Sequence, residues 1–150
     1  SKQKQFQQNL KSSIKNPFVI AIKGYSLMNF KNQNYPTIIT EYIHNGSLFD
    51  ALQNKISLTS ANKYIILLGI AEGMRYLHSQ NIIHGNLKPQ NILLDQNLYP
   101  HICDYYDFKI SKIFHSSNIM EIYIGAPIYL SPEILSCDFY SDKVDVYSFH

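Results

Sequence analysis

The hydrophobic positions along the chain predict an alternation of short strands and helices. In the segment 6–14, apolar residues recur every four positions, which indicates one face of a short helix that ends before Pro17. The segments 18–27 (FVIAIKGYSL) and 36–42 (PTIITEY) have the apolar composition of strands and are separated by a polar turn. We therefore expect these two segments to form an antiparallel pair.

Two helices are predicted in the middle of the chain. A turn at 44–46 (HNG) precedes Ser47, which can cap a short helix that runs through Leu52. The longest predicted helix runs from Thr59 to about Gln80. Its apolar residues recur at helical spacing and cover a wide face: Ile65, Ile66, Leu67, Leu68, Ile70, Ala71, Met74 and Leu77. A face this wide predicts burial on several sides.

The last third of the chain predicts a hairpin, a long irregular segment and a final helix. Residues 91–94 (NILL) and 100–103 (PHIC) are short apolar runs joined by a turn-like sequence. Residues 105–131 have no regular pattern, and Ser141 can cap a helix in the segment 141–149. Together the elements predict a mixed α+β architecture in which helix dominates.

Composition narrows the class of protein. A chain of 150 residues with 45% hydrophobic and 16% charged residues is typical of one folded globular domain. A net charge of +2 is too small to indicate nucleic acid or an anionic membrane as partner. Cys103 and Cys137 form no disulfide framework or ligand cluster. The first residues are polar, and Glu72 and Arg75 interrupt the most apolar helical run, so we expect a cytoplasmic protein.

The segment 82–95, IIHGNLKPQNILLD, carries the candidate chemistry. Phosphoryl transfer needs a group that orients the attacking hydroxyl, cations on the transferred phosphate, and oxygen ligands for Mg²⁺. Lys88 supplies a mobile positive charge, and Asn91 supplies a carbonyl oxygen that is a suitable ligand for Mg²⁺. Asp104, one hairpin later, can supply a second oxygen ligand. Asn86, however, is an amide at the position where this chemistry requires a carboxylate.

This segment resembles the catalytic loop of eukaryotic protein kinases, H-R-D-L-K-x-x-N. Four further segments resemble other kinase motifs in the same order: PTIITEYIHNGSLFDAL (36–52), AEGMRYLHSQNIIH (71–84), GAPIYLSPEIL (125–135) and SDKVDVYSFH (141–150). The features are most similar to the tyrosine-kinase-like branch of the serine/threonine kinases. Several motifs in the correct order over nearly the whole chain make the resemblance specific.

The resemblance implies an α+β protein kinase-like fold over residues 1–150. Residues 1–40 would be an incomplete N-lobe with the C helix and the last two strands, and residues 41–46 the hinge. Residues 47–150 would be the first half of a mainly helical C-lobe. We therefore expect about half of a kinase domain, with the Gly-rich phosphate loop and the ATP-pairing lysine strand preceding residue 1.

The resemblance also implies ATP and Mg²⁺ as cofactors. The hinge backbone at Glu41 and Ile43 would receive adenine, with Thr40 as gatekeeper and Leu93 as a further cofactor-binding residue. Lys88 would contact the transferred phosphate, and Asn91 would bind the metal.

Two registers are open for the second metal ligand. Asp104 lies at the usual spacing from Asn91 and directly ends a predicted strand, so it is favoured. Asp107 is the alternative, since the residues that follow it match the family's local pattern better. In both registers the glycine of the D-F-G motif is replaced, by Tyr106 or by Lys109.

Other positions depart from the family pattern. Asn86 occupies the position of the Asp that accepts the substrate hydroxyl, which predicts impaired catalysis. Gly85 replaces the Arg that pairs with a phosphorylated residue in the family. In the C helix, Gln7 occupies the position of the acid that would pair with the ATP-binding lysine.

Three matching positions are expected to have structural roles. His84 would pack in the core beneath the loop, Glu133 is equivalent to the acid of the A-P-E motif, and Asp145 would hold the catalytic loop through backbone hydrogen bonds. The sequence thus predicts a catalytically impaired pseudokinase that acts in binding or regulation through a protein partner. The alternative is a weakly active, ATP-dependent serine/threonine kinase with a protein substrate. Neither nucleic acid nor membrane is an expected partner.

Overall fold

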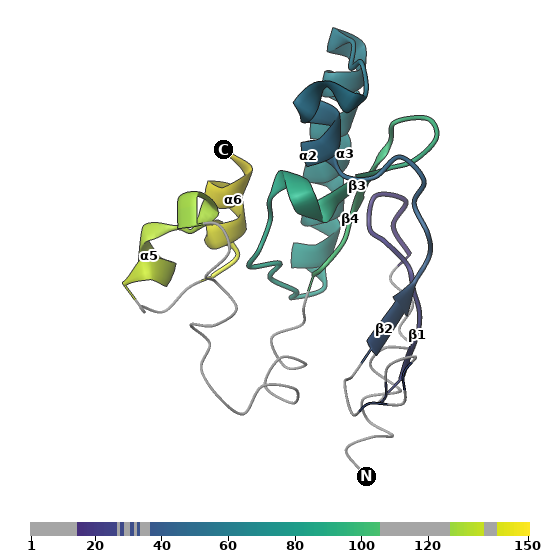
Figure 1. Ribbon diagram of the computed structural model, residues 1–150. Helices are drawn as coiled ribbons and strands as arrows, with labels where there is room; N and C mark the ends of the chain where they lie inside the picture. The colour runs from purple at the N-terminus through teal and green to yellow at the C-terminus, as the bar shows by residue number, and fades with distance from the viewer. Residues whose placement is uncertain are drawn as a thin grey trace.

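The structure is a computed structural model, and it describes residues 15–26, 28, 31, 33, 37–105, 127–136 and 141–150. The helix predicted over 6–14 lies outside these residues, as do Gln7, Tyr106, Asp107, Lys109 and Cys137. The described part has the expected α+β architecture, with two small antiparallel sheets and several helices arranged around one long helix (Figure 1).

The predicted antiparallel pair near the start of the chain is confirmed. Strand β1 (Ile22–Ser26) pairs with β2 (Thr37–Thr40), with an irregularity between Ile22 and Gly24. The first strand is shorter than the predicted 18–27, because residues 18–20 bond to another part of the chain. The Ile20 N–H donates to the Ile102 carbonyl at 2.9 Å, and the Ile102 N–H donates to the Phe18 carbonyl at 2.8 Å.

Both central helices begin at the predicted capping residues. Helix α2 (Leu48–Asp50) continues as a π-helical turn, Ala51–Lys55, slightly beyond the predicted end at Leu52. The Ser47 hydroxyl accepts from the Asp50 N–H at 3.2 Å, and the Asp50 carboxylate accepts from the Ser47 N–H at 3.3 Å. Helix α3 (Ser60–Ser79) has the same reciprocal cap between Thr59 and Asn62. These side chains satisfy N–H groups that have no partner inside the helix.

The predicted hairpin is formed by β3 (Ile92–Leu94) and β4 (Pro100–Ile102). The remaining described elements are short: the 3₁₀ turns Pro89–Asn91 and Pro127–Tyr129, helix α5 (Pro132–Leu135) and helix α6 (Lys143–Phe149). Helix α6 begins after Asp142 and not after the predicted cap Ser141, whose hydroxyl accepts from the Lys143 N–H only at a long 3.4 Å.

Helix α3 packs one face against β4. Its buried residues follow a single stripe: Ile66, Gly69, Ile70, Gly73, Met74 and Leu77. Glycine is needed at 69 because a Cβ atom there would lie 2.5 Å from Cγ of Pro100. Helix α3 and strand β4 therefore approach more closely than a side chain at position 69 would allow.

The prediction that α3 is buried on several sides is wrong for four of the residues that define its wide apolar face, one of which is the exposed Ala71. Ile65, Leu67 and Leu68 are 39%, 52% and 54% exposed. Within the described part of the chain, β4 and residues 18–20 cover only the stripe that faces them.

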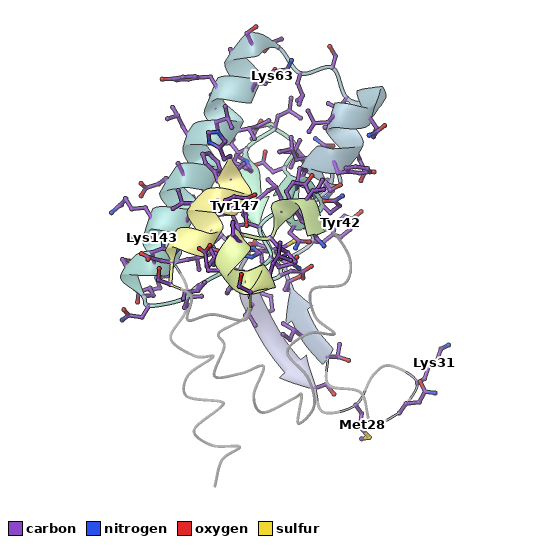
Figure 2. The ribbon with its side chains drawn as sticks, turned by 90° about the vertical axis from the view of Figure 1, so that its left-hand side faces the viewer. Met28, Lys31, Tyr42, Lys63, Lys143 and Tyr147 are labelled. Carbon is purple, nitrogen blue, oxygen red and sulfur yellow. The ribbon has the colours of Figure 1, made fainter. Side chains whose placement is uncertain are left out.

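Figure 2 shows Lys63 at the start of α3, with Met28 and Lys31 at the opposite end of the molecule, beyond β1.

Candidate functional site

A tight turn at the end of α3 directs the chain into the loop 82–91. Asn81 adopts the left-handed conformation, with φ 57°, and the Ile82 N–H donates to the Leu77 carbonyl at 3.0 Å. Asparagine tolerates this conformation better than most residues, and the backbone bond satisfies a carbonyl at the helix end. The loop therefore begins at a defined position directly after α3.

The Asp145 side chain anchors the first residues of the loop. Its Oδ2 accepts from the His84 N–H at 2.8 Å, and its Oδ1 accepts from the Gly85 N–H at 2.7 Å. Oδ2 also lies 2.8 Å from Nε2 of His78, near the end of α3. Asp145 itself is 1% exposed. One buried carboxylate from α6 thus binds both the loop backbone and α3, as the resemblance implied for the backbone contacts.

His84 connects the loop to the end of β4. Its Nδ1 accepts from the Asn86 N–H at 3.2 Å, which leaves Nε2 to donate to the Cys103 carbonyl at 3.0 Å. This pattern requires the neutral ring with its hydrogen on Nε2. Burial lowers the pKa of His84 below its ordinary value, and the negative charge of Asp145 opposes this shift. His84 is buried as predicted, at 3% exposure.

The Asn91 side chain closes the loop from its other end. Its Nδ2 donates to the Asn86 carbonyl at 2.8 Å, and its backbone carbonyl accepts from the Cys103 N–H at 2.9 Å. Since the Asn86 carbonyl can only accept, the amide nitrogen of Asn91 faces it. Oδ1 is therefore the side-chain atom of Asn91 that is able to contact a metal ion.

Asp104 immediately follows the residue that is bonded to both His84 and Asn91. Its side chain is exposed, and its φ of 56° lies in the left-handed region. Within the described residues, no group of three or more His, Cys, Asp or Glu side chains is placed to hold a metal ion. Asp104 is one residue away from Cys103, whose N–H donates to the Asn91 carbonyl.

Asn86 and Lys88, which are expected to lie nearest the substrate hydroxyl and the transferred phosphate, are both half-buried. Asn86 has its N–H and its carbonyl engaged by His84 and Asn91, so its backbone is held from both sides. Lys88 precedes the 3₁₀ turn at Pro89 with an extended backbone. The loop 84–91 contains no Asp or Glu.

The predicted hinge lies beside β3. The Leu94 N–H donates to the Gly46 carbonyl at 2.9 Å, the Asn45 N–H donates to the Leu94 carbonyl at 3.1 Å, and Ser47 forms a bridge with Leu93. The structure therefore brings Leu93 next to the end of the hinge.

The start of the hinge is tied to the strand pair. The Glu41 N–H donates to the Ala21 carbonyl at 3.1 Å, and its carboxylate accepts from the Ala21 N–H at 2.7 Å. The exposed Thr40 donates its hydroxyl to the Glu41 carbonyl at 3.1 Å, and Ile43 packs against the core. The Glu41 side chain thus has a structural contact of its own.

Glu133 lies away from these contacts, half-buried in the first turn of α5. Figure 1 shows α5 and α6 next to each other on one side of the loop, and the strands β1 and β2 on the other side. The structure therefore groups His84, Asn86, Asn91, Asp104 and Asp145, but leaves Glu133 outside this group.

Two residues of the site were not singled out by the sequence pattern. His78 contacts Asp145, and Tyr105 donates its hydroxyl to the Ile20 carbonyl at 3.0 Å. His78 follows the buried Met74 by one helical turn, so its place on the buried side of α3 was a detectable signal. The Tyr105 contact joins residues far apart in the chain and left no such signal.

Comparison with known proteins agrees with these motifs. The family model of the protein kinase domain matches residues 3–149. A probable serine/threonine-protein kinase of Dictyostelium discoideum is 45% identical over 112 residues, which are 74% of this chain and 12% of that protein. An RGS domain-containing serine/threonine-protein kinase A of the same organism is 43% identical over 74% of this chain and 10% of its own length.

A myosin light chain kinase A of D. discoideum is 31% identical over 97% of this chain and 50% of its own length. The chain therefore spans about a tenth of the first two relatives and half of the third.

No described helix is both long enough and apolar enough to cross a membrane.

Proposed function

Because the chain belongs to the protein kinase family, we propose that it is a catalytically impaired kinase domain that acts by binding. In this role it regulates or holds a protein partner rather than transferring phosphate efficiently. We assign it to the tyrosine-kinase-like branch on the motifs that precede and follow its catalytic loop.

The observation that carries this proposal is that an amide, Asn86, is held at the position of the catalytic base. Its backbone is held by His84 and Asn91, so the loop presents this residue in a defined position. An amide can orient a hydroxyl but cannot accept its proton, and loss of general-base assistance costs about 10²–10⁴-fold in rate. The loop 84–91 contains no carboxylate that could act as the base instead. The hydrogen bonds that hold the loop are thus present, but the loop has no general base.

Gly85 indicates that one common form of regulation is absent from this domain. Its φ of 69° lies in the left-handed region, where a side chain costs about 1–2 kcal/mol. Glycine adopts this conformation freely, but it supplies no cation for a phosphorylated residue. We therefore propose that the domain is not controlled by the charge pairing that an arginine at this position would provide.

The residues of the site suit a magnesium nucleotide. We propose that the hinge backbone at Glu41 and Ile43, beside Thr40 and Leu93, receives the adenine of ATP. Bound Mg²⁺ would neutralise the phosphate charge. Oxygen atoms of Asn91 and Asp104 would hold the ion. A half-buried Lys88 on the same loop as Asn91 supports a phosphate position there.

A weakly active serine/threonine protein kinase is the second candidate. The intact Asp145 anchor favours it, because both backbone N–H groups at the start of the loop remain bound to the carboxylate. In this case Asn86 would orient a Ser or Thr hydroxyl of a protein substrate. The serine/threonine kinases among the relatives agree with that substrate class.

The small net charge of +2 and the absence of a spanning helix among the described residues support two further parts of the proposal. We propose that the partner or substrate is a protein, not a nucleic acid or a membrane, and that the domain acts in the cytoplasm.

The first test is the melting temperature of the 150-residue chain with ATP and Mg²⁺, with ATP and EDTA, and without nucleotide. Binding to the folded state stabilises it by about 2.7 kcal/mol at one hundred times Kd. We expect a rise that requires Mg²⁺. A melt that ATP does not move under either condition would contradict the nucleotide site and leave a binding domain without a cofactor.

The second test restores the carboxylate. In an assay with radiolabelled ATP and a Ser/Thr peptide, Asn86→Asp should raise phosphoryl transfer by about 10²-fold or more if the remaining site is intact. Asn97→Asp, in the hairpin turn, adds the same charge away from the site and is the control. High activity in the unaltered chain would overturn the impaired-kinase proposal in favour of the active one.

A further inference from the structure

A cavity lies between the π-helical turn that ends α2 and the start of α3. Its volume is about 380 Å³, and it is lined by Ala51, Leu52, Ile56, Ser57, Leu58 and Lys63. Figure 1 shows this end of α2 and α3 far from the strands β1 and β2. Binding pockets in proteins have volumes of about 300–1,000 Å³. The cavity is therefore large enough for one or two side chains of another molecule.

One wall of the cavity is apolar and belongs to the folded core. Ala51 is 3% exposed and part of the core cluster, and both Ile56 and Leu58 pack against that cluster. Leu52, in contrast, is 52% exposed. The π-helical turn Ala51–Lys55 is a rare backbone form that is frequent at functional sites. An apolar side chain that entered here would contact a fixed wall and remove Leu52 from water.

The opposite wall of the cavity is positively charged. Lys63 is exposed among the first four residues of α3, and the first turn of this helix contains no acidic residue. The N-terminus of a helix also carries a partial positive charge. The sequence 51–71 contains Lys55 and Lys63 but no Asp or Glu. An acidic group next to an apolar one would therefore complement the cavity.

We propose that this cavity is a docking site for a protein partner, and that the docked segment carries Leu or Phe next to Asp or Glu. The apolar side chain packs against Ala51 and Leu52, and the carboxylate lies beside Lys63. The choice of a protein as occupant rests on the function proposed above. No lining residue belongs to the loop 82–91 or to the hinge 41–46, so docking leaves the proposed nucleotide site open.

The first experiment identifies the occupant. Displayed random peptides are selected on the 150-residue chain, and the strongest binder is synthesised with a fluorescent label. We expect Leu or Phe beside Asp or Glu in the selected sequences. In an anisotropy titration, Leu52→Ala should weaken binding of this peptide about tenfold, because it removes most of one exposed apolar side chain.

Leu67→Ala is the matched control for Leu52→Ala. Leu67 is also 52% exposed, but it does not line the cavity. Both substitutions are at exposed positions, so both chains should fold, which their melting temperatures check. Equal effects of the two substitutions on peptide binding would overturn the proposal.

The second experiment reverses the charge. Lys63→Glu should weaken binding of the same peptide by about fivefold or more, and this effect should decrease as salt is added. A peptide whose acidic residues are replaced by Lys should bind the Lys63→Glu chain better than the unaltered one. Lys143→Glu is the control, since Lys143 is exposed at the start of α6, away from the cavity (Figure 2). Binding that does not depend on the sign of the charge at position 63 would overturn the proposal.

The melting temperature with ATP and Mg²⁺ separates docking from the nucleotide site. Leu52→Ala and Lys63→Glu should weaken peptide binding but leave the shift caused by ATP unchanged. If the unaltered chain shows no such shift, the nucleotide site fails, and the peptide titrations still decide the docking site. If decanoate displaces the peptide and binds more tightly, the cavity takes a small amphipathic anion, and the protein occupant is overturned.

Discussion

Nε2 of His78 and Oδ2 of Asp145 lie 2.8 Å apart, although 67 positions separate the two residues in the chain. The same carboxylate binds the backbone of His84 and Gly85. Asp145 therefore joins three parts of the structure: the end of α3, the start of the loop, and α6. Because it is 1% exposed, these contacts take the place of its hydration.

Asp145→Asn should destabilise the fold strongly. The amide nitrogen of the substituted side chain would face a backbone N–H of the loop, so the loop would lose an acceptor. We expect a loss of about 3 kcal/mol in the free energy of unfolding, measured by urea denaturation. Asp142→Asn is the control, because Asp142 is exposed at the start of the same helix. Equal effects of the two substitutions would contradict the anchor.

The pH dependence of stability should show the buried, neutral His84. Burial holds the pKa of this ring below 6.5, so the unfolded chain binds a proton in the window below 6.5 that the folded chain does not bind. The contribution of His84 is therefore fully present above this pH, and it decreases as the pH falls toward the lowered pKa. We expect a lower urea midpoint at about pH 5.5 than at about pH 7.5.

An NMR titration follows the ring signal of His84 individually. The His84 ring should stay neutral while the pH passes below 6.5. A His84 signal that titrates above its ordinary pKa would contradict the neutral tautomer required by its contacts with Asn86 and Cys103.

Gly69→Ala should lower stability although alanine favours helix. The new Cβ would lie 2.5 Å from Cγ of Pro100 and 3.0 Å from Cδ1 of Phe18. The proline ring cannot turn away, so we expect a net loss of about 1–3 kcal/mol. Ala71→Gly, on the exposed side of α3, should cost about 1 kcal/mol through helix propensity alone. A Gly69→Ala chain with a higher melting temperature would show that α3 and β4 do not pack as closely as described.

Asn91→Ala should separate nucleotide binding from metal binding. It removes the bond to the Asn86 carbonyl and the proposed oxygen ligand, so the ATP-induced shift in melting temperature should no longer depend on Mg²⁺. The lost hydrogen bond should also cost about 1–3 kcal/mol of stability. Gln90→Ala, at an exposed neighbouring position, should change neither quantity. An unchanged Mg²⁺ dependence in Asn91→Ala would exclude Asn91 as a ligand.

Much of the local structure could be predicted because its causes lie within a few residues. The caps at Ser47 and Thr59 depend on side chains three positions away, and the hairpin of β3 and β4 depends on a short turn between two apolar runs. The kinase-like motif of the segment 82–95 could also be recognised from its residues and their spacing. By contrast, the exposure of Leu67 and Leu68 depends on which neighbours cover α3, and the spacing of apolar residues alone could not predict it.

The sequence by itself determined the family, the order of the elements and the absence of a carboxylate at Asn86, because each depends on residue identity and short spacing. The resemblance already implied the backbone bonds of Asp145 to the loop, and only the tertiary structure decided the remaining contacts. The bonds from Asp145 to His78 and from Tyr105 to Ile20 join residues that are 67 and 85 positions apart. Such contacts exist only after the chain has closed on itself, so no local pattern records them.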